Sequence, residues 1–217
     1  MYKAVIFDMD GTILDTLEDI CASINAALQS EGYPARTIEE VRQMVGNGNR
    51  KLAERAVPAG AGADAAERVF RAFHAHYRIH AADHTKVYSG IEPLIAELRR
   101  RGVRTAVVSN KADYAVQALC RRYFPGLFDA SAGDRDGVRR KPYPDGVLAM
   151  LDVLGVSSGE AVYVGDSEVD VETARNAGLF CIAVTWGFRT KEFLLERGAR
   201  CTVDSAEELG RLLLTNA

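Results

Sequence analysis

The stretch AVIFDMDGT, residues 4–12, decides the fold prediction. Its first four residues form an uninterrupted apolar run, and a short run of this kind that stops at polar residues and glycine is typical of a strand buried on both faces. Two aspartates and a glycine follow at once. In sheets covered by helices on both faces, ligands bind beyond the carboxyl ends of the strands. The stretch therefore predicts a buried strand whose end carries chemistry.

Three further apolar runs share this pattern, at residues 103–108, 161–164 and 180–184. Helical patterns lie between them, each ending next to a glycine that can terminate a helix, at residues 91–101, 144–154 and 169–177. Strands that alternate with helices form parallel βαβ units. We therefore predict the α/β class, with a doubly wound, Rossmann-like parallel sheet.

Residues 15–82 interrupt the alternation, because they contain no strand-like run. Apolar residues recur there at helical spacing, and the loops are rich in glycine and proline. We predict an inserted all-helical domain at residues 15–82, within an α/β core domain formed by residues 1–14 and 83–217.

The composition argues against several classes of function. Lys and Arg number 27 and Asp and Glu 30 among 217 residues, which gives a formal net charge of −3. Nucleic-acid binders and polybasic membrane binders need an excess of cations, so we expect neither partner. No apolar run approaches the roughly 20 residues of a membrane-spanning helix, and the first residues do not resemble a signal peptide. We expect a cytoplasmic protein, either a monomer or a homodimer.

Asp8 and Asp10 are the first candidate functional residues. In an extended chain, residues two apart point the same way, so both carboxylates would converge at the end of the strand. A hard cation such as Mg²⁺ relieves the repulsion between them. Gly11 lets the backbone N–H come close to an anion. The alternative is an acidic turn that merely ends a strand.

Polar residues also follow the next two predicted strands. Ser109 and Asn110 follow the second, Asp166 follows the third, and Asp170 comes one helical turn later. Lys141 precedes the helix at 144–154 and offers a compact charge for phosphate. Taken alone, each of these sequence patterns also fits an ordinary helix N-cap or a solvent-exposed loop. Together they suit metal-assisted phosphoryl transfer through an aspartate nucleophile.

This combination closely resembles the four motifs of the haloacid dehalogenase superfamily of hydrolases. The resemblance rests on FDMDGT at 7–12 with Asp15, Ser109-Asn110, Lys141-Pro142, and GDS at 165–167 with Asp170. Residues 163–178 and 80–90 resemble the phosphoglycolate phosphatase-like branch, and the helical stretch resembles the cap domain of that branch.

The resemblance implies a role for each motif residue. Asp8 would be the nucleophile, and Asp10 the general acid and then the general base. Lys141 would offset charge near Asp8, and would hold the phosphoryl group with Ser109, Asn110 and Gly11.

The resemblance also implies a magnesium site. Mg²⁺ would be bound by the side chains of Asp8 and Asp166 and by the main-chain carbonyl of Asp10. Thr12 and Asp170 would support these groups from behind, with Asp170 orienting Lys141 or metal-bound water.

An aspartate at position 10 favours a phosphatase or a phosphomutase, because in this family the dehalogenases lack an acid there and the ATPases carry threonine. We predict a Mg²⁺-dependent phosphatase that hydrolyses a small phosphorylated metabolite through an aspartyl-phosphate, with 2-phosphoglycolate the best candidate. The alternatives are a β-phosphoglucomutase-like phosphosugar mutase, and a pyrophosphatase or nucleotide phosphatase of the same superfamily. A non-catalytic phospho-receiver module is a more remote alternative.

Three features lie outside the motifs. The glycine-rich stretch 46–50 is interpreted as a specificity loop whose Arg50 binds a substrate carboxylate, or as a plain interhelical loop. His76, His80 and His84 have the spacing of one helical face, but carboxylates or thiols at ligand spacing are nearly absent, so a metal site there is disfavoured. Trp186 is interpreted as a packing residue.

Overall fold

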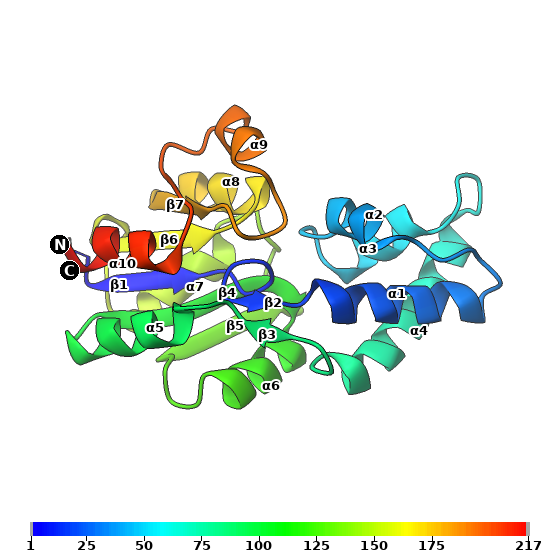
Figure 1. Cartoon of the computed structure of the whole chain (residues 1–217), viewed down its shortest axis with the longest axis horizontal. Helices are drawn as coiled ribbons and strands as arrows, with labels where there is room; N and C mark the ends of the chain where they lie inside the picture. Colours follow the sequence, from blue (N-terminus) through cyan, green and yellow to red (C-terminus); the bar gives the residue numbers. More distant parts are fainter. Residues whose placement is uncertain (1, 216–217) are drawn as a thin grey trace. The chain divides into compact units, whose positions relative to one another are not determined.

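The computed structural model describes residues 2–215 and separates the chain into two compact units (Figure 1). One unit is formed by the chain up to residue 14 and from residue 87 onward, and the other by Asp15–Lys86. The chain passes from one unit to the other at two short strands, β2 (Leu14–Asp15) and β3 (Lys86–Val87). These two strands pair with each other.

The larger unit is built on a six-stranded sheet in the order β5-β4-β1-β6-β7-β8. All the pairs are parallel, which confirms the predicted fold class. The strands are β1 (Ala4–Phe7), β4 (Arg104–Ala112), β5 (Ala130–Asp134), β6 (Ala161–Gly165), β7 (Phe180–Val184) and β8 (Thr202–Val203). Every residue of β1 is buried, because this strand lies between β4 and β6 with helices over both faces.

Helices cover both faces of this sheet. They are α5 (Ile91–Arg100), α6 (Asp113–Tyr123), α7 (Asp145–Leu154), α8 (Glu168–Ala177), α9 (Lys191–Glu196) and α10 (Ala206–Thr215), with a 3₁₀ turn at Ser158–Glu160. On one face, Ile6, Val108 and Tyr163 share a buried cluster with Leu151 of α7 and Ala174 of α8. On the other, α5 and α6 pack against β4, and α10 packs against α5. The sheet is therefore doubly wound, as the apolar strands predicted.

The smaller unit is helical. It contains α1 (Leu17–Ser30), α2 (Ile38–Met44), α3 (Asn49–Ala56) and α4 (Ala63–His80), with α4 packed against α1 and α3. Asp19 of α1 is 1% exposed and accepts hydrogen bonds from the main-chain amides of His84 and Thr85 and from the Thr85 hydroxyl. These bonds tie the segment that leaves α4 to the start of α1, and they hold the pKa of Asp19 below its usual value although burial acts to raise it.

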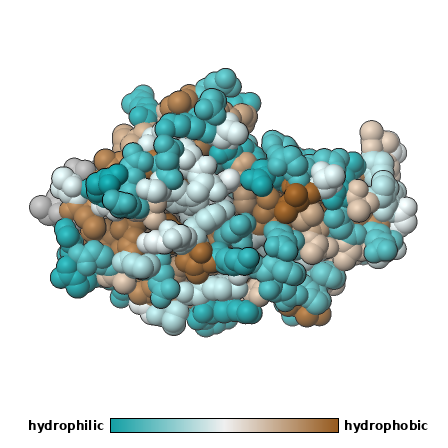
Figure 2. Space-filling view, in the orientation of Figure 1, coloured by the Kyte–Doolittle hydropathy of each residue, from teal (hydrophilic) through white to brown (hydrophobic). Residues whose placement is uncertain are grey.

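Large apolar side chains are exposed at separate places, including Ile79, Val153 and Leu195. Figure 2 shows hydrophilic residues over much of the α/β unit in this view, with smaller hydrophobic patches between them. Scattered exposure of this kind is ordinary for a globular protein. Among the described helices, none combines the length and the hydropathy that crossing a membrane requires.

Candidate active site

The sheet order brings the motif residues of the larger unit to one edge. Asp8 directly follows β1, Ser109 lies near the end of β4, and Asp166 directly follows β6. These three strands are neighbours, and in a parallel sheet their carboxyl ends meet. The Asp8 amide donates to the Val164 carbonyl at 2.8 Å, which continues the ladder past the end of β1. The fold thus places three separate motifs beside one another.

Three carboxylates form a buried cluster at this edge. One oxygen each from Asp8, Asp166 and Asp170 lies within 4.8 Å of the others. Burial raises the pKa of Asp8 to about 6, against the lowering effect of Lys141, and the neighbouring carboxylates of Asp170 and Asp10 add to the rise. Burial and the carboxylates of Asp170 and Asp8 raise the pKa of Asp166 well above its usual value. Such a cluster stays ionised at neutral pH only if a cation compensates it.

Lys141 supplies part of that compensation. Its Nζ lies 2.9 Å from Asp8 Oδ1 and 2.7 Å from Asp170 Oδ1, and it donates to the Tyr163 hydroxyl at 3.1 Å. Its side chain is only 5% exposed. Burial acts to lower the pKa of Lys141, but the carboxylates of Asp170 and Asp8 outweigh it and raise the pKa well above its usual value. Lys141 therefore remains an ammonium ion in contact with both carboxylates.

Asp166 is held by two loops. Phe188 N donates to Asp166 Oδ2 at 2.7 Å, and the Thr12 hydroxyl donates to Oδ1 at 3.2 Å. A Cβ atom on Gly11 would overlap the Asp166 carboxylate, and one on Gly187 would overlap both Asp166 and the Gly11 carbonyl. Gly11 also has a φ of +82°. Glycine is thus needed at both positions for the chain to approach this carboxylate.

The segment from Trp186 to Arg189 is a part of the site in which the sequence analysis named only Trp186, as a packing residue. Trp186 Nε1 donates to the Thr12 carbonyl at 3.0 Å, so the indole fixes the turn that follows Asp10 instead of only filling space. Arg189 is 7% exposed and pairs with Glu168 at the start of α8, at 3.0 Å. The available signal was the glycine at 187, placed just beyond the fourth predicted strand.

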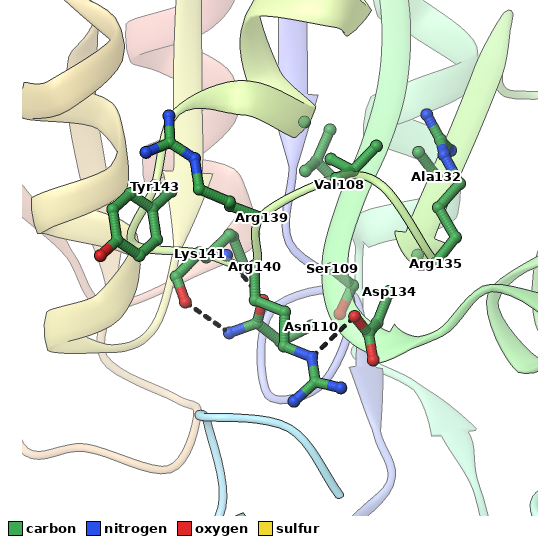
Figure 3. Close-up of a pocket in the computed structure, with 13 residues that line it drawn as sticks. Val108, Ser109, Asn110, Ala132, Asp134, Arg135, Arg139, Arg140, Lys141 and Tyr143 are labelled. Carbon is green, nitrogen blue, oxygen red and sulfur yellow. Dashed lines mark hydrogen bonds and ion pairs between the residues drawn. The ribbon is translucent and has the colours of Figure 1, made fainter.

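Asn110 and Lys141 are joined through the main chain. Asn110 Nδ2 donates to the Lys141 carbonyl at 3.0 Å, and the Lys141 amide donates to Asn110 Oδ1 at 2.8 Å. Figure 3 shows the first of these bonds beside the ion pair of Arg140 and Asp134. The Asn110 side chain therefore positions the backbone from which the Lys141 ammonium projects.

The pocket in Figure 3 lies next to this junction, and Ser109 and Asn110 form part of its wall. Two of its arginines already have carboxylate partners, Arg140 with Asp134 at 2.7 Å and Arg139 with Asp145 at 2.9 Å. The positive charge of these two arginines is therefore largely offset by neighbouring carboxylates, and we assign the pocket no ligand of its own.

Lys111 is a further site residue that the sequence analysis did not identify. Its Nζ lies 2.8 Å from Asp10 Oδ1, and its side chain is 2% exposed. The Asp10 side chain is 20% exposed. Asp8 and Asp10, two residues apart, are thus each paired with a different buried lysine.

The remaining predicted residues lie elsewhere. Asp15 accepts a hydrogen bond from the Leu17 amide at 3.4 Å, at the start of α1. Arg50 belongs to the helical unit, where it pairs with Glu67 and lies 4.4 Å from the Phe70 ring centroid. His80 and His84 pair with Asp83 and Asp19. Within residues 2–215, the only acidic, histidine or cysteine group with the spacing of metal ligands is the Asp8 cluster.

The cluster fits a divalent cation. Asp8 Oδ1 is buried and accepts no hydrogen bond from the described residues, since its contact with Lys141 is an ion pair without hydrogen-bond geometry. Asp170 is already occupied, because its carboxylate accepts from Ser167 Oγ at 2.6 Å and from Lys141 at 2.7 Å. Carboxylate oxygens are the ligands that Mg²⁺ prefers. The contacts thus favour Asp8 as a ligand and Asp170 as the partner for Lys141. Asp166 also accepts two hydrogen bonds, from Phe188 N and the Thr12 hydroxyl, so its role as a ligand rests on the motif resemblance and on its place in the cluster.

Comparison with known proteins agrees with this geometry. The model of the haloacid dehalogenase-like hydrolase family matches residues 5–184. A phosphoglycolate phosphatase of Chromobacterium violaceum is 35% identical, with 97% of this chain and 96% of that protein covered. Phosphoglycolate phosphatase 1 of Pseudomonas aeruginosa is 33% identical over 95% of this chain and 78% of its own length.

Two solved structures show the same likeness across the whole chain. A crystal structure from Lactobacillus delbrueckii subsp. bulgaricus has a TM-score of 0.94 and 38% identity, with 98% of each chain covered. CbbY from Rhodobacter sphaeroides, in complex with phosphate, has a TM-score of 0.77 and 30% identity, with 97% of each chain covered.

Proposed function

We infer that this chain, which belongs to the haloacid dehalogenase-like hydrolase family, is a phosphatase that forms an aspartyl-phosphate on Asp8. The observation that carries the assignment is the placement of Asp8. Its carboxylate is buried, lies 2.9 Å from the Lys141 ammonium, and shares one cluster with Asp166 and Asp170. A carboxylate so placed at the carboxyl edge of the sheet is a nucleophile held beside positive charge.

The first step breaks the phosphate ester. A carboxylate oxygen of Asp8 forms a bond to phosphorus, the bond from phosphorus to the ester oxygen breaks, and Asp10 gives its proton to the departing oxygen. Ser109 and Lys141 hold the phosphoryl oxygens, and Lys141 also reduces the repulsion between Asp8 and the phosphate dianion.

The second step returns the enzyme to its starting state. Asp10, now a carboxylate, takes a proton from water, and the water oxygen attacks phosphorus. The bond between Asp8 and phosphorus breaks, which releases inorganic phosphate and restores the Asp8 carboxylate. Asn110 acts through its hydrogen bonds to the Lys141 main chain.

Mg²⁺ is the cation we propose for the cluster. The side chains of Asp8 and Asp166 and the main-chain carbonyl of Asp10 would hold it, with Thr12 supporting Asp166 through its hydroxyl. When bound, it supplies positive charge that offsets the repulsion among the carboxylates and the substrate phosphate.

Magnesium binding should depend steeply on pH. Burial raises the pKa of Asp8 to about 6 in the metal-free protein, so this carboxyl is protonated at lower pH, and a metal must displace that proton. We expect Mg²⁺ to raise the unfolding temperature clearly at about pH 8 and hardly at all at about pH 5. The Asp166→Asn variant should lose the shift at both pH values. Equal shifts at the two pH values in the unmodified protein would contradict a site built on these carboxylates.

The substrate we propose is 2-phosphoglycolate, a small phosphate ester that carries a carboxylate. The support is the activity named for the relatives from Chromobacterium violaceum and Pseudomonas aeruginosa. We further propose that the helical stretch, residues 15–82, is a cap domain that selects the leaving group, with Arg50 the residue for the substrate carboxylate. Glu67 already pairs with Arg50 and would have to be displaced.

A phosphatase for sugar bisphosphates is the second candidate. It is favoured by the likeness to CbbY of Rhodobacter sphaeroides, whose mutant form was also solved in complex with xylulose-1,5-bisphosphate. A phosphosugar mutase would use the same core residues, but would transfer the phosphoryl group to a sugar phosphate instead of to water.

Phosphate release from a panel of esters, with and without Mg²⁺, tests the proposal. The panel holds 2-phosphoglycolate, xylulose-1,5-bisphosphate, pyrophosphate, nucleoside monophosphates and glucose 1-phosphate. We expect Mg²⁺-dependent release from 2-phosphoglycolate with kcat/KM of about 10⁴ M⁻¹s⁻¹ or more, well above the others. Preference for the bisphosphate would select the second candidate. Conversion of glucose 1-phosphate to its isomer without phosphate release would select the mutase, and no turnover of any ester would overturn the function.

A further inference from the structure

We propose that Lys111 is a positioning residue that holds the Asp10 carboxyl group in the orientation needed for proton transfer to the leaving oxygen. The proposal rests on the function assigned above, because it concerns the general acid of that reaction. Its basis is the contact of 2.8 Å between Lys111 Nζ and Asp10 Oδ1.

The burial of Lys111 shows that this contact is built into the fold. Lysine side chains are almost never fully buried unless they are paired, because removing the ammonium from water is costly. The Lys111 side chain is 2% exposed, whereas that of Asp10 is 20% exposed. The lysine therefore approaches Asp10 from inside the protein, and the carboxyl group it holds remains accessible from outside.

The backbone fixes the position from which Lys111 reaches Asp10. The pairing of β4 with β5 shifts register between Val108 and Ala112, and Lys111 lies within this irregular stretch. A Cβ atom on Gly133 of β5 would overlap the Lys111 carbonyl and the main chain of Asp113. Gly133 N also donates to Asp113 Oδ1 at 2.8 Å. The close approach of β5 thus holds the chain on both sides of Lys111.

The two buried lysines have different partners, which separates their roles. Lys141 contacts Asp8 and Asp170, and so acts where the bond to phosphorus forms. Lys111 contacts Asp10, and so acts where the proton is transferred. Proton transfer requires the donor within about 2.6–3.2 Å of the accepting atom, so a carboxyl group free to rotate would meet this condition less often.

This separation predicts dependence on the leaving group. An alkyl phosphate such as 2-phosphoglycolate releases a strongly basic oxygen that needs the proton of Asp10. p-Nitrophenyl phosphate releases a weakly basic oxygen that departs without it. Hydrolysis of the aspartyl-phosphate, in which Asp10 acts as the base, is common to both esters, so the comparison is made on kcat/KM, which reports the steps up to loss of the leaving group. A positioning residue for the acid should therefore lower kcat/KM far more for the first ester than for the second, whereas a residue that binds phosphate or maintains the fold should lower both alike.

The test compares these esters in the Lys111→Met and Asp10→Asn variants and in the double variant. General acid catalysis is worth about 10²–10⁴-fold, so we expect Lys111→Met to lower kcat/KM for 2-phosphoglycolate by about 10–100-fold. We expect kcat/KM for p-nitrophenyl phosphate to change by less than about threefold, whereas kcat falls for either ester wherever hydrolysis of the aspartyl-phosphate limits turnover. The double variant should be no slower than Asp10→Asn alone, because Lys111 acts through Asp10.

Controls keep the outcome decisive. Lys191→Met removes an exposed lysine that pairs with Asp204, and should change neither rate. If Lys111→Met does not fold, Lys111→Gln is measured in the same way. Equal losses of kcat/KM for both esters, or losses that multiply in the double variant, would overturn the proposal while leaving the phosphatase function intact. Absence of turnover of both esters by the unmodified protein would instead overturn the function.

Discussion

Replacing Asp8 by asparagine should lower phosphate release by at least about 10³-fold, because the amide keeps the shape of the side chain but cannot attack phosphorus as a carboxylate does. The fold should persist. Burial raises the pKa of Asp8 to about 6, so above that pH the carboxylate is ionised in the metal-free protein and destabilises the folded state relative to the unfolded one. The neutral amide avoids this cost, and we expect the unfolding temperature without Mg²⁺ at about pH 8 to be unchanged or higher.

A matched substitution shows whether the loss is specific. Asp152→Asn changes an exposed aspartate of α7 and should leave phosphate release unchanged. Near-normal release by the Asp8→Asn variant, with the protein folded, would show that another group attacks phosphorus.

Replacing Lys141 by methionine should damage both activity and stability. The variant would leave the buried carboxylates of Asp8 and Asp170 without their ammonium partner. Removing one member of a buried ion pair typically costs about 3–5 kcal/mol of unfolding free energy. We also expect a loss of turnover of at least about 10³-fold, because the charge beside the nucleophile and the phosphoryl group is gone.

The stability loss should depend on pH. Since burial raises the pKa of Asp8 to about 6, protonation at lower pH removes part of the unpaired charge. The Lys141→Met variant should therefore be less destabilised at about pH 5 than at about pH 8, as measured by chemical unfolding without Mg²⁺. Adding Asp170→Asn should restore part of the stability at about pH 8 without restoring turnover. An equal loss at both pH values would show that the lysine acts through packing instead of charge.

The central strands were predictable because their apolar runs are continuous. The runs at 4–7, 161–164 and 180–184 match β1, β6 and β7 closely. The sequence analysis did not predict β5, because its sequence ASAGD holds no large apolar residue, or β8, which has only two residues. These two strands lie at the sheet edges and depend on the neighbours they pair with.

The sequence reveals those site residues that carry a reactive or polar group and also directly follow a predicted strand. Asp8, Ser109 and Asp166 follow apolar runs, so a parallel sheet brings them together. Lys111 carries no such signal, because a lysine after a strand also reads as an exposed residue. Its role depends on the register shift in β4 and on the approach of Gly133, which are properties of the tertiary structure.

The same holds for Gly187 and Asn110. Gly187 matters because Asp166 and Gly11 lie against it, and residues so far apart in sequence are brought together only by the fold. The Asn110 amide suits phosphate as well as main chain, and only the structure shows that it bonds to Lys141. The residue types thus indicated the chemistry of the site, but the partners of each residue could be identified only from the structure.

Detection of the aspartyl-phosphate tests the account most directly. The protein would be mixed with 2-phosphoglycolate and Mg²⁺, quenched in acid within the first turnover, and digested for mass spectrometry, with the Asp8→Asn variant treated in parallel. We predict that the peptide containing residues 4–12 gains the mass of one phosphoryl group at Asp8, and that the variant gains none. Steady phosphate release with no phosphoryl group on Asp8 at any quench time, or with the group on another residue, would contradict the assignment of Asp8 as the nucleophile.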